Sequence, residues 1–414
     1  MIPRFIFSYQ IFLALALLVG QGLALPTGDA HNQDLISLLT KRDTGSKFIL
    51  MGFSVARNSD SEQPTDPLVS LNGAVSSPID NKLYHYNIDL EVGSNKQKIT
   101  VDVDTGSSDF WVVATDATCQ KGRKCKAQGT YNASQSNTSK DLNQPFLLGY
   151  IDGSTTSGTY YLDDITLPGG ITAKQAQFAN ANTTSSPFAI LGIGLKSLEA
   201  PILAGGTQTY DNFPWVLKNQ GFINKAAYSL FLSSPSAESG TLLFGGIDNA
   251  KFEGPLYKLS GAFPSRLGVK LDSIAVDGGV TDSSTGFVFD SGYSYSSWPK
   301  ATADAIGSAL QGSSQSGNSW LADCTQPNKT ITLNFGNGAK QIRVPYSSFI
   351  APEQKSTGTC STTIGYSVDG NYDNLPTFGD DVLRSFYVVY DIEENSLQIA
   401  QAVYTSQSDV TAIE

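Results

Sequence analysis

VDTGSS at residues 103–108 and FDSGYS at residues 289–294 are two stretches of this sequence built on one pattern. Each follows an apolar run and presents an Asp, a hydroxyl residue and a Gly in that order. Gly lets the backbone turn tightly and approach another segment closely, so each stretch predicts a strand that ends in a turn carrying one carboxylate. Asp104 and Asp290 lie 186 residues apart, in equivalent places of two halves of similar size. Two carboxylates that share one proton can act as acid and base on a single water molecule.

The rest of the chain has the pattern of an all-β protein. From residue 82 on, short runs alternate apolar and polar residues and are interrupted by Gly, Asn, Asp and Ser, as at residues 99–103 and 387–391. The chain has 39 Gly, and charged residues make up 16%, below the roughly 25% of typical globular chains. Helical patterns are few, and residues 301–310 and 379–386 carry the best of them.

The scarcity of histidine restricts the chemistry. The 414 residues include two histidines, His31 and His85, and His31 lies in a segment that we expect to be removed. Hydrolases with a Ser or Cys nucleophile need an imidazole beside it. No H-E-x-x-H motif and no C-x-x-C pair occurs. We therefore expect any hydrolytic chemistry to be carried by Asp or Glu.

The formal charge of -11 and the pI near 4.7 argue against a nucleic acid as partner, because phosphate binding needs a basic surface. An acidic chain suits a protein that stays soluble, or works, in acid. Many secreted proteins are simply acidic, so this alternative stays open.

The N-terminus is typical of a secretory signal at residues 1–24. Arg4 precedes an apolar run over residues 11–19, and small residues follow at 22–24. The run is too short to span a membrane, and the C-terminal residues 406–414 are polar. We expect a secreted, extracellular protein with no membrane anchor.

Residues 25–75 are polar and irregular and are predicted to be a pro-segment of uncertain end, which would make the product a zymogen. The dibasic pair Lys41-Arg42 is a candidate processing site, and the alternative is a flexible tail with two adjacent charges. Within this segment, residues 48–55 have the composition of a strand.

Export makes disulfides expected between the four cysteines Cys119, Cys125, Cys324 and Cys360. Pairing of sequence neighbours is one of three possible connectivities. Four N-x-S/T sequons, at Asn132, Asn137, Asn182 and Asn328, are consistent with an exported glycoprotein.

Beyond the two triplets, the chain resembles the pepsin-like aspartic proteinases, most closely the secreted aspartic proteinases of Candida-type yeasts. The resemblance runs from about residue 83 to residue 403. It rests on the triplets, and further on DFWVV at 109–113, GYIDGS at 149–154, AILGIGL at 189–195, FGGIDNAK at 244–251 and FGDDVLR at 378–384.

This resemblance implies a fungal protein with the pepsin-like fold. That fold is all-β and has two β-barrel-like lobes with a cleft between them. The N-terminal lobe, with the first catalytic Asp and the flap, would span residues 76–250, and the C-terminal lobe would span residues 251–414. The enzyme would be a monomer that needs no metal and no cofactor. The cysteine spacings resemble that family's two disulfides, Cys119 with Cys125 and Cys324 with Cys360.

Carried over residue by residue, the resemblance makes Asp104 and Asp290 the catalytic pair. Tyr150 would cover the site from a flap hairpin, with the indole of Trp111 beneath it. An exposed hairpin Tyr and a plain core Trp are the alternatives. The residues expected to contact substrate are Asp102, Gly106, Tyr150, Asp152, Gly153, Gly292 and Ser294, and those expected to support the pair are Thr105, Ser107, Trp111, Ser291 and Tyr293.

The sequence departs from the family pattern at four places. Tyr293 stands where a small hydroxyl residue usually supports the second carboxylate, and its own hydroxyl would reach from further away. Asp102 replaces an apolar residue on the same strand face as Asp104 and suggests a preference for Lys or Arg before the cut, unless local hydrogen bonds occupy it. Residues 25–75 carry a net charge of -2 where such pro-segments are typically basic. Ile151 replaces a Gly in the flap.

The sequence therefore predicts a secreted acid endopeptidase that hydrolyses peptide bonds in proteins or peptides with a water activated by Asp104 and Asp290. The alternative is a catalytically weak family member that acts as a secreted or cell-surface binding protein, which Tyr293 and Asp102 favour. A glycosidase with two acidic residues is a further rival, although no aromatic-rich sugar platform is visible.

Overall fold

The computed structural model describes residues 47–57, 84–235, 237, 239–317, 319–351, 358–367 and 375–414. All of them lie in one unit, residues 40–414. The expected signal peptide at 1–24 and the dibasic pair at 41–42 lie outside the described residues.

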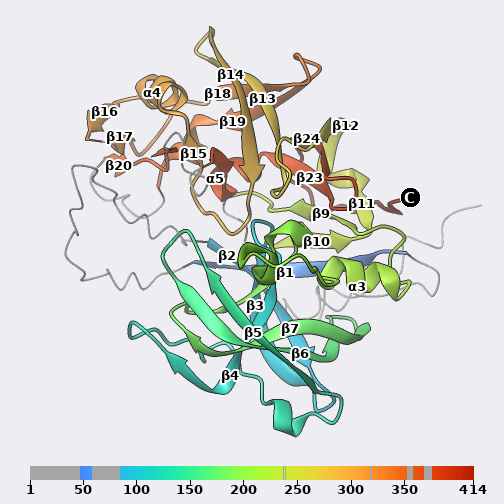
Figure 1. The fold of residues 1–414 in the computed structure, drawn as a ribbon. Coiled ribbons are helices and arrows are strands. Elements are labelled where there is room, and N and C mark those ends of the chain that lie inside the picture. Colours follow the sequence, from blue (N-terminus) through green and yellow to red (C-terminus); the bar gives the residue numbers. More distant parts are fainter. Residues whose placement is uncertain are drawn as a thin grey trace, which may run out of the picture. The chain divides into compact units, whose positions relative to one another are not determined.

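Strands dominate the fold, as expected from the alternating pattern. One sheet has thirteen strands in the order β12-β24-β23-β9-β10-β1-β2-β3-β8-β4-β7-β6-β5. Figure 1 shows β3 to β7 on one side of β1, β9 and β10, and β13, β14, β18 and β19 on the other. In chain order the strands of this sheet are β1 (Ile49–Arg57), β2 (Tyr84–Val92), β3 (Gln97–Asp104), β4 (Phe110–Cys119), β5 (Lys140–Gly149), β6 (Thr155–Thr166), β7 (Thr172–Thr184), β8 (Ala189–Gly192), β9 (Ala227–Phe231), β10 (Ser239–Phe244), β12 (Phe252–Ser260), β23 (Phe386–Asp391) and β24 (Ser396–Ala402).

The C-terminal half adds a seven-stranded sheet in the order β19-β18-β13-β14-β22-β15-β21 and two small sheets, β16-β17-β20 and β11-β25. Their strands are β11 (Gly246–Asp248), β13 (Gly268–Val276), β14 (Gly279–Phe289), β15 (Ser297–Trp298), β16 (Ser314–Ser316), β17 (Ser319–Asp323), β18 (Thr330–Phe335), β19 (Lys340–Pro345), β20 (Thr359–Ser361), β21 (Gly365–Tyr366), β22 (Thr377–Phe378) and β25 (Val410–Ala412). This bilobal all-β architecture confirms the predicted fold class.

Helices are short in the described residues. Both predicted helices form, as α4 (Lys300–Ala309) and α5 (Asp380–Leu383). The others are α2 (Ala200–Leu203) and α3 (Phe213–Asn219), and the 3₁₀ turns are η1 (Ala133–Gln135), η2 (Lys196–Leu198), η3 (Asn249–Lys251) and η4 (Tyr346–Phe349). In the described part of the chain, no helix is both long and apolar enough to cross a bilayer.

The two Asp-hydroxyl-Gly triplets occupy equivalent places. The first follows β3, which pairs in parallel with β8 so that Asp104 lies opposite Gly192. The second follows β14, which pairs in parallel with β22 so that Phe289 lies opposite Phe378. Each half thus brings an apolar-Gly element beside the strand that precedes its Asp.

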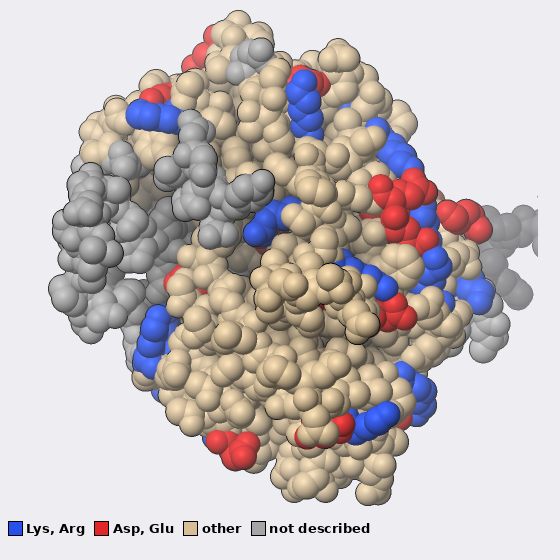
Figure 2. Space-filling view, viewed as in Figure 1, with Lys and Arg blue, Asp and Glu red and all other residues tan. Residues whose placement is uncertain are grey.

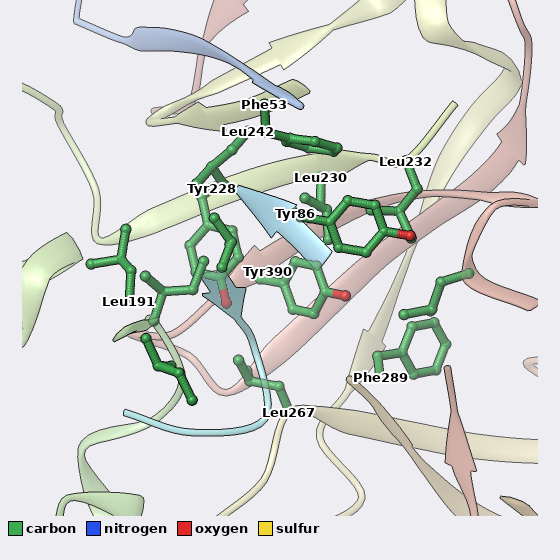
Figure 3. Close-up of a cluster of buried hydrophobic side chains, with 14 of the residues drawn as sticks. Phe53, Tyr86, Leu191, Tyr228, Leu230, Leu232, Leu242, Leu267, Phe289 and Tyr390 are labelled. Carbon is green, nitrogen blue, oxygen red and sulfur yellow. The ribbon is translucent and has the colours of Figure 1, made fainter. Parts of the chain in front are cut away.

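A buried aromatic and aliphatic cluster joins the two halves (Figure 3). Tyr228 of β9 stacks on Tyr390 of β23 with ring centroids 5.0 Å apart. Leu191 of β8 and Phe289 of β14 contribute to the same cluster from the two triplet-bearing segments. The strands that end at the triplets are therefore fixed by one shared core.

Strand β1 confirms the strand expected at residues 48–55, and it is an interior strand of the sheet. It pairs with β10 over residues 49–54 and with β2 over residues 54–57. Met51 and Phe53 are fully buried. A pro-segment that ended at residue 75 would take this strand with it.

The disulfides are Cys119–Cys125 and Cys324–Cys360, which resolves the connectivity in favour of sequence neighbours. The first closes a six-residue span at the end of β4. The second ties β20 to the segment that follows β17.

Candidate active site

The two triplets hold each other through their hydroxyl residues. The Thr105 hydroxyl donates a hydrogen bond to the Phe289 carbonyl (3.0 Å) and accepts one from the Ser291 N–H (2.9 Å). The Ser291 hydroxyl makes the equivalent pair of bonds from the second turn. It donates to the Val103 carbonyl (3.0 Å) and accepts from the Thr105 N–H (3.2 Å). Four hydrogen bonds across the junction therefore lock the two turns at one separation and orientation.

Glycine follows each hydroxyl residue because the opposite carboxylate takes the space of a side chain. A Cβ at Gly106 would lie 2.1 Å from Oδ2 of Asp290, and a Cβ at Gly292 would lie 2.6 Å from Oδ1 of Asp104. Both distances are far inside van der Waals contact. The two carboxylates thus meet only because neither turn carries a side chain at this position.

The two carboxylates have different surroundings. Asp104, 7% exposed, accepts hydrogen bonds from the Ser107 hydroxyl (2.5 Å) and the Gly106 N–H (2.8 Å). Asp290 accepts one from the Gly292 N–H (2.8 Å). Burial and the neighbouring Asp104 carboxylate raise the pKa of Asp290 to about 7. The nearby Arg266 guanidinium opposes this increase by favouring the ionised form.

Tyr293 occupies the position equivalent to Ser107, but its hydroxyl makes no hydrogen bond with Asp290. The residue acts through its backbone: its carbonyl accepts from the Asp380 N–H (2.8 Å), just as the Ser107 carbonyl accepts from the Gly194 N–H (2.8 Å). The backbone of the second turn is therefore held like that of the first, while the hydroxyl donor to the second carboxylate is missing.

The hairpin β5–β6 is the one expected to cover the site as the flap, and Tyr150 directly follows β5. The Trp111 indole N–H donates to the Tyr150 hydroxyl at 2.6 Å. Burial and the charge of Asp104 raise the pKa of Tyr150 well above its usual value, so the phenol lies within the electrostatic field of the pair. Of the flap-tip residues, Asp152 and Gly153 are exposed, and the Asp152 carboxylate accepts from the Ser154 N–H (2.9 Å).

The position of Asp102 does not fit the substrate contact expected for it. Its carboxylate is 2% exposed, accepts a hydrogen bond from the Tyr86 N–H (2.9 Å) and lies 3.4 Å from Nδ1 of His85. The local hydrogen bonds that the sequence left as the alternative occupy it. Ser294 is also buried, which does not fit the expected contact with substrate.

Sequence reasoning missed two features around the pair. Arg266 lies on the segment between β12 and β13, and no motif marks it. Asp380, at the start of α5, is fully buried, and burial raises its pKa well above the usual range while Arg384 opposes the shift. The adjacent acids of GDDVLR in an apolar context were the available signal for a buried carboxyl.

No group of three or more His, Cys, Asp and Glu side chains placed to hold a metal ion occurs among the residues that the structure describes. The arrangement that these residues do show is a pair of facing carboxyl groups, one of which holds a proton below about pH 7. Such a pair can take a proton from a water molecule and give one to a carbonyl oxygen.

Comparison with known proteins agrees with this geometry. Residues 85–402 match the family model described as eukaryotic aspartyl protease. The chain is 38% identical to secreted aspartic protease 4 of Candida albicans over 408 residues, which cover 90% of this chain and 95% of the relative. It is 36% identical to candidapepsin of Candida tropicalis over 418 residues, which cover 99% of both chains.

Replacing Thr105 tests the junction between the turns. Thr105→Val keeps the shape but leaves the Phe289 carbonyl and the Ser291 N–H without partners. We expect the free energy of unfolding to fall by about 2–5 kcal/mol, measured by denaturant titration. Thr105→Ser retains the hydroxyl and should lose clearly less. Equal losses in the two variants would mean that the hydroxyl does not hold the junction.

Proposed function

This chain belongs to the eukaryotic aspartyl protease family, and we propose that Asp104 and Asp290 are its catalytic pair. It is a secreted aspartic endopeptidase that acts on protein or peptide substrates. The observation that carries the proposal is the close approach of two carboxyl groups with unequal hydrogen-bond donors. The glycosidase alternative loses its basis with this family assignment. A catalytically weak family member would belong to the same family, and the digestion assay below distinguishes it from an active endopeptidase.

The unequal donors assign the roles at the start of the reaction. Asp104 accepts from Ser107 and Gly106 and is the ionised member. Asp290 holds the shared proton, because burial and the charge of Asp104 raise its pKa to about 7. As a coupled pair, the two groups lose this proton in one macroscopic step.

A water bound between the carboxyl groups then attacks the peptide carbonyl. The Asp104 carboxylate takes a proton from this water as its oxygen bonds to the carbonyl carbon, and Asp290 gives its proton to the carbonyl oxygen. The tetrahedral intermediate collapses when Asp104 gives the proton it took from the water to the nitrogen and the C–N bond breaks. A hydroxyl of the intermediate returns its proton to Asp290 as the new carboxyl group forms. Tyr150 on the flap limits access of bulk water, and Trp111 fixes the phenol.

Asp102 and Ser294 have no part in the proposed binding surface. Gly106 and Gly292 let the substrate backbone approach the pair, and Asp152 and Gly153 offer backbone groups from the flap tip. Thr105 and Ser291 position the two turns.

We further propose that cleavage after Lys41-Arg42 produces the mature chain. The pro-segment then ends at residue 42 and not at residue 75. This is the one dibasic pair between residues 25 and 83. Cleavage there keeps β1, whose Met51 and Phe53 are buried in the core. The N-terminal lobe then extends from residue 43 to about residue 250, and the C-terminal lobe follows from residue 251.

Asp290→Asn tests the proposed pair. An amide cannot hold the shared proton, so we expect kcat for protein digestion in acid to fall by about a hundredfold to ten-thousandfold. Asp89→Asn, a change at an exposed carboxyl on β2 that accepts from Thr100, is the matched control and should keep full activity. Equal digestion by Asp290→Asn and the parent would remove Asp290 from the mechanism.

Tyr293→Thr tests why Asp290 keeps its proton. A small hydroxyl at this position can donate to the Asp290 carboxylate as Ser107 does to Asp104, and a donor stabilises the ionised form. The upper limb of the pH profile of kcat/KM, set near pH 7 by Asp290, should therefore move to lower pH. Tyr293→Phe lacks the donor and should leave the limb in place. An unmoved limb in Tyr293→Thr would contradict the role of the missing donor.

N-terminal sequencing of the secreted protein tests the processing site. We expect the mature chain to begin at Asp43 and Arg42→Ala to abolish this terminus. Lys47→Ala, a change at an isolated lysine nearby, serves as the control. A mature terminus near residue 76 would contradict the proposal and would mean that β1 leaves the sheet on maturation.

A further inference from the structure

The disulfide Cys119–Cys125 closes a loop that is strongly basic in an acidic protein. Residues 121–126 contain Lys121, Arg123, Lys124 and Lys126, four of the 27 Lys and Arg in a chain of net charge -11. We call residues 119–126 the basic loop. So dense a group of cations is not what the overall composition predicts.

The basic loop is held in place at several points. Besides the disulfide, the Gln120 N–H donates to the Thr184 carbonyl of β7 (2.7 Å), and the Arg123 N–H donates to the Gln120 carbonyl (3.1 Å). The Lys126 ammonium donates to the Thr115 carbonyl of β4 (2.8 Å). A braced loop presents its charges at fixed positions, which lowers the entropy lost when a ligand binds.

The basic loop lies against the tip of the flap. The Lys121 ammonium donates to the Gly153 carbonyl at 3.4 Å. Gly153 is three residues from Tyr150, whose phenol is in the field of Asp104. A charge on this loop is therefore next to the hairpin that covers the proposed catalytic pair.

Lys121, Lys124 and Lys126 are exposed, and none forms an ion pair with a carboxylate among the described residues. Many other lysines do, such as Lys225 with Asp391 and Glu394. Charged side chains are sparse on the face shown in Figure 2, where most of the surface is neither acidic nor basic. Two acids belong to the same part of the fold: Asp116 on β4, three residues before the loop, and Asp152 on the flap, which accepts a hydrogen bond from the Ser154 N–H. They leave the region with an excess of positive charge.

We propose that the basic loop is an anion-binding rim beside the flap and favours peptide substrates that carry an acidic side chain where the chain passes the flap tip. Carboxylate and phosphate side chains share this chemistry. The inference rests on the proposed catalytic pair, since the flap marks a substrate path only if that pair is the active centre.

The physics of exposed charges sets the size and the pH range of the effect. An exposed ion pair changes binding by about two- to fivefold and weakens with salt. A substrate Glu ionises above about pH 4.3, so its preference should appear near pH 5 and disappear near pH 3. A phosphoserine keeps one negative charge at about pH 3 and should remain preferred there. A purely structural role of the lysines would produce no such difference.

The test compares kcat/KM for peptide pairs that differ only by Glu against Gln at one position, placed in turn at each position around the scissile bond. In the parent enzyme at about pH 5 and low salt, one position should show a Glu preference. Lys121→Gln with Lys124→Gln should lower this preference about fivefold, mainly through KM. Lys124→Gln alone isolates charge, because Lys121 is the residue that contacts the flap.

Lys98→Gln is the matched control. Lys98 is an exposed lysine six residues before Asp104 on β3, at a distance of about 20 Å along the strand, and should not alter the ratio. Arg123 and Lys126 of the loop remain in the double variant, as does Arg266, so the readout is the decrease in the Glu preference. A Glu preference that does not decrease overturns the proposal. The proposal is also overturned if the double variant binds an anionic polysaccharide more weakly than the parent but keeps the parent's ratio of kcat/KM for the Glu and Gln peptides. The rate with the Gln peptide reports on the catalytic pair, so a failure of the pair is seen separately from a failure of the rim.

Discussion

The reciprocal hydrogen bonds of Thr105 and Ser291 are the constraint on which the site depends. Each hydroxyl reaches a carbonyl of the opposite half, so neither turn can move without breaking bonds of both. The carboxyl groups follow these turns directly, and Gly106 and Gly292 remove the atoms that would separate them. The large shared core behind the turns, with Tyr228 stacked on Tyr390, gives this small network a rigid support.

The two turns that carry Asp104 and Asp290 have similar backbones but different side chains beside the carboxyl groups. The backbone bonds that hold Ser107 and Tyr293 are equivalent, which makes the two turns alike in shape. The hydroxyl of Ser107 reaches its carboxylate, whereas that of Tyr293 does not. This difference favours the shared proton on Asp290, and a single residue that differs between two similar turns is enough to distinguish the proposed acid from the proposed base.

The sequence predicted those features that depend on local pattern. The two triplets marked both carboxyl groups, and alternation marked β1 and the other strands. Asp102 shows where such reasoning ends: strand alternation places it on the face of Asp104, but the Tyr86 N–H and His85, which belong to another strand, take up its carboxylate. Arg266 likewise influences Asp290 electrostatically only because the C-terminal half folds as it does, and no spacing in the chain encodes that proximity.

The buried acids explain why the fold and the chemistry favour the same pH range. Burial raises the pKa of Glu199, beside the helix α2, from 4.5 to about 8. The folded chain therefore binds this proton more tightly than the unfolded chain does. The contribution of this proton to the stability of the folded state is complete below about pH 4.5 and is lost as the pH rises through about 8. Asp290 and Asp381, with pKa values raised to about 7 and about 6, act with the same sign. The proposed catalytic pair, which needs one proton, thus lies in a protein whose buried acids also bind protons in the folded state, and both lose these protons as the pH rises toward neutral.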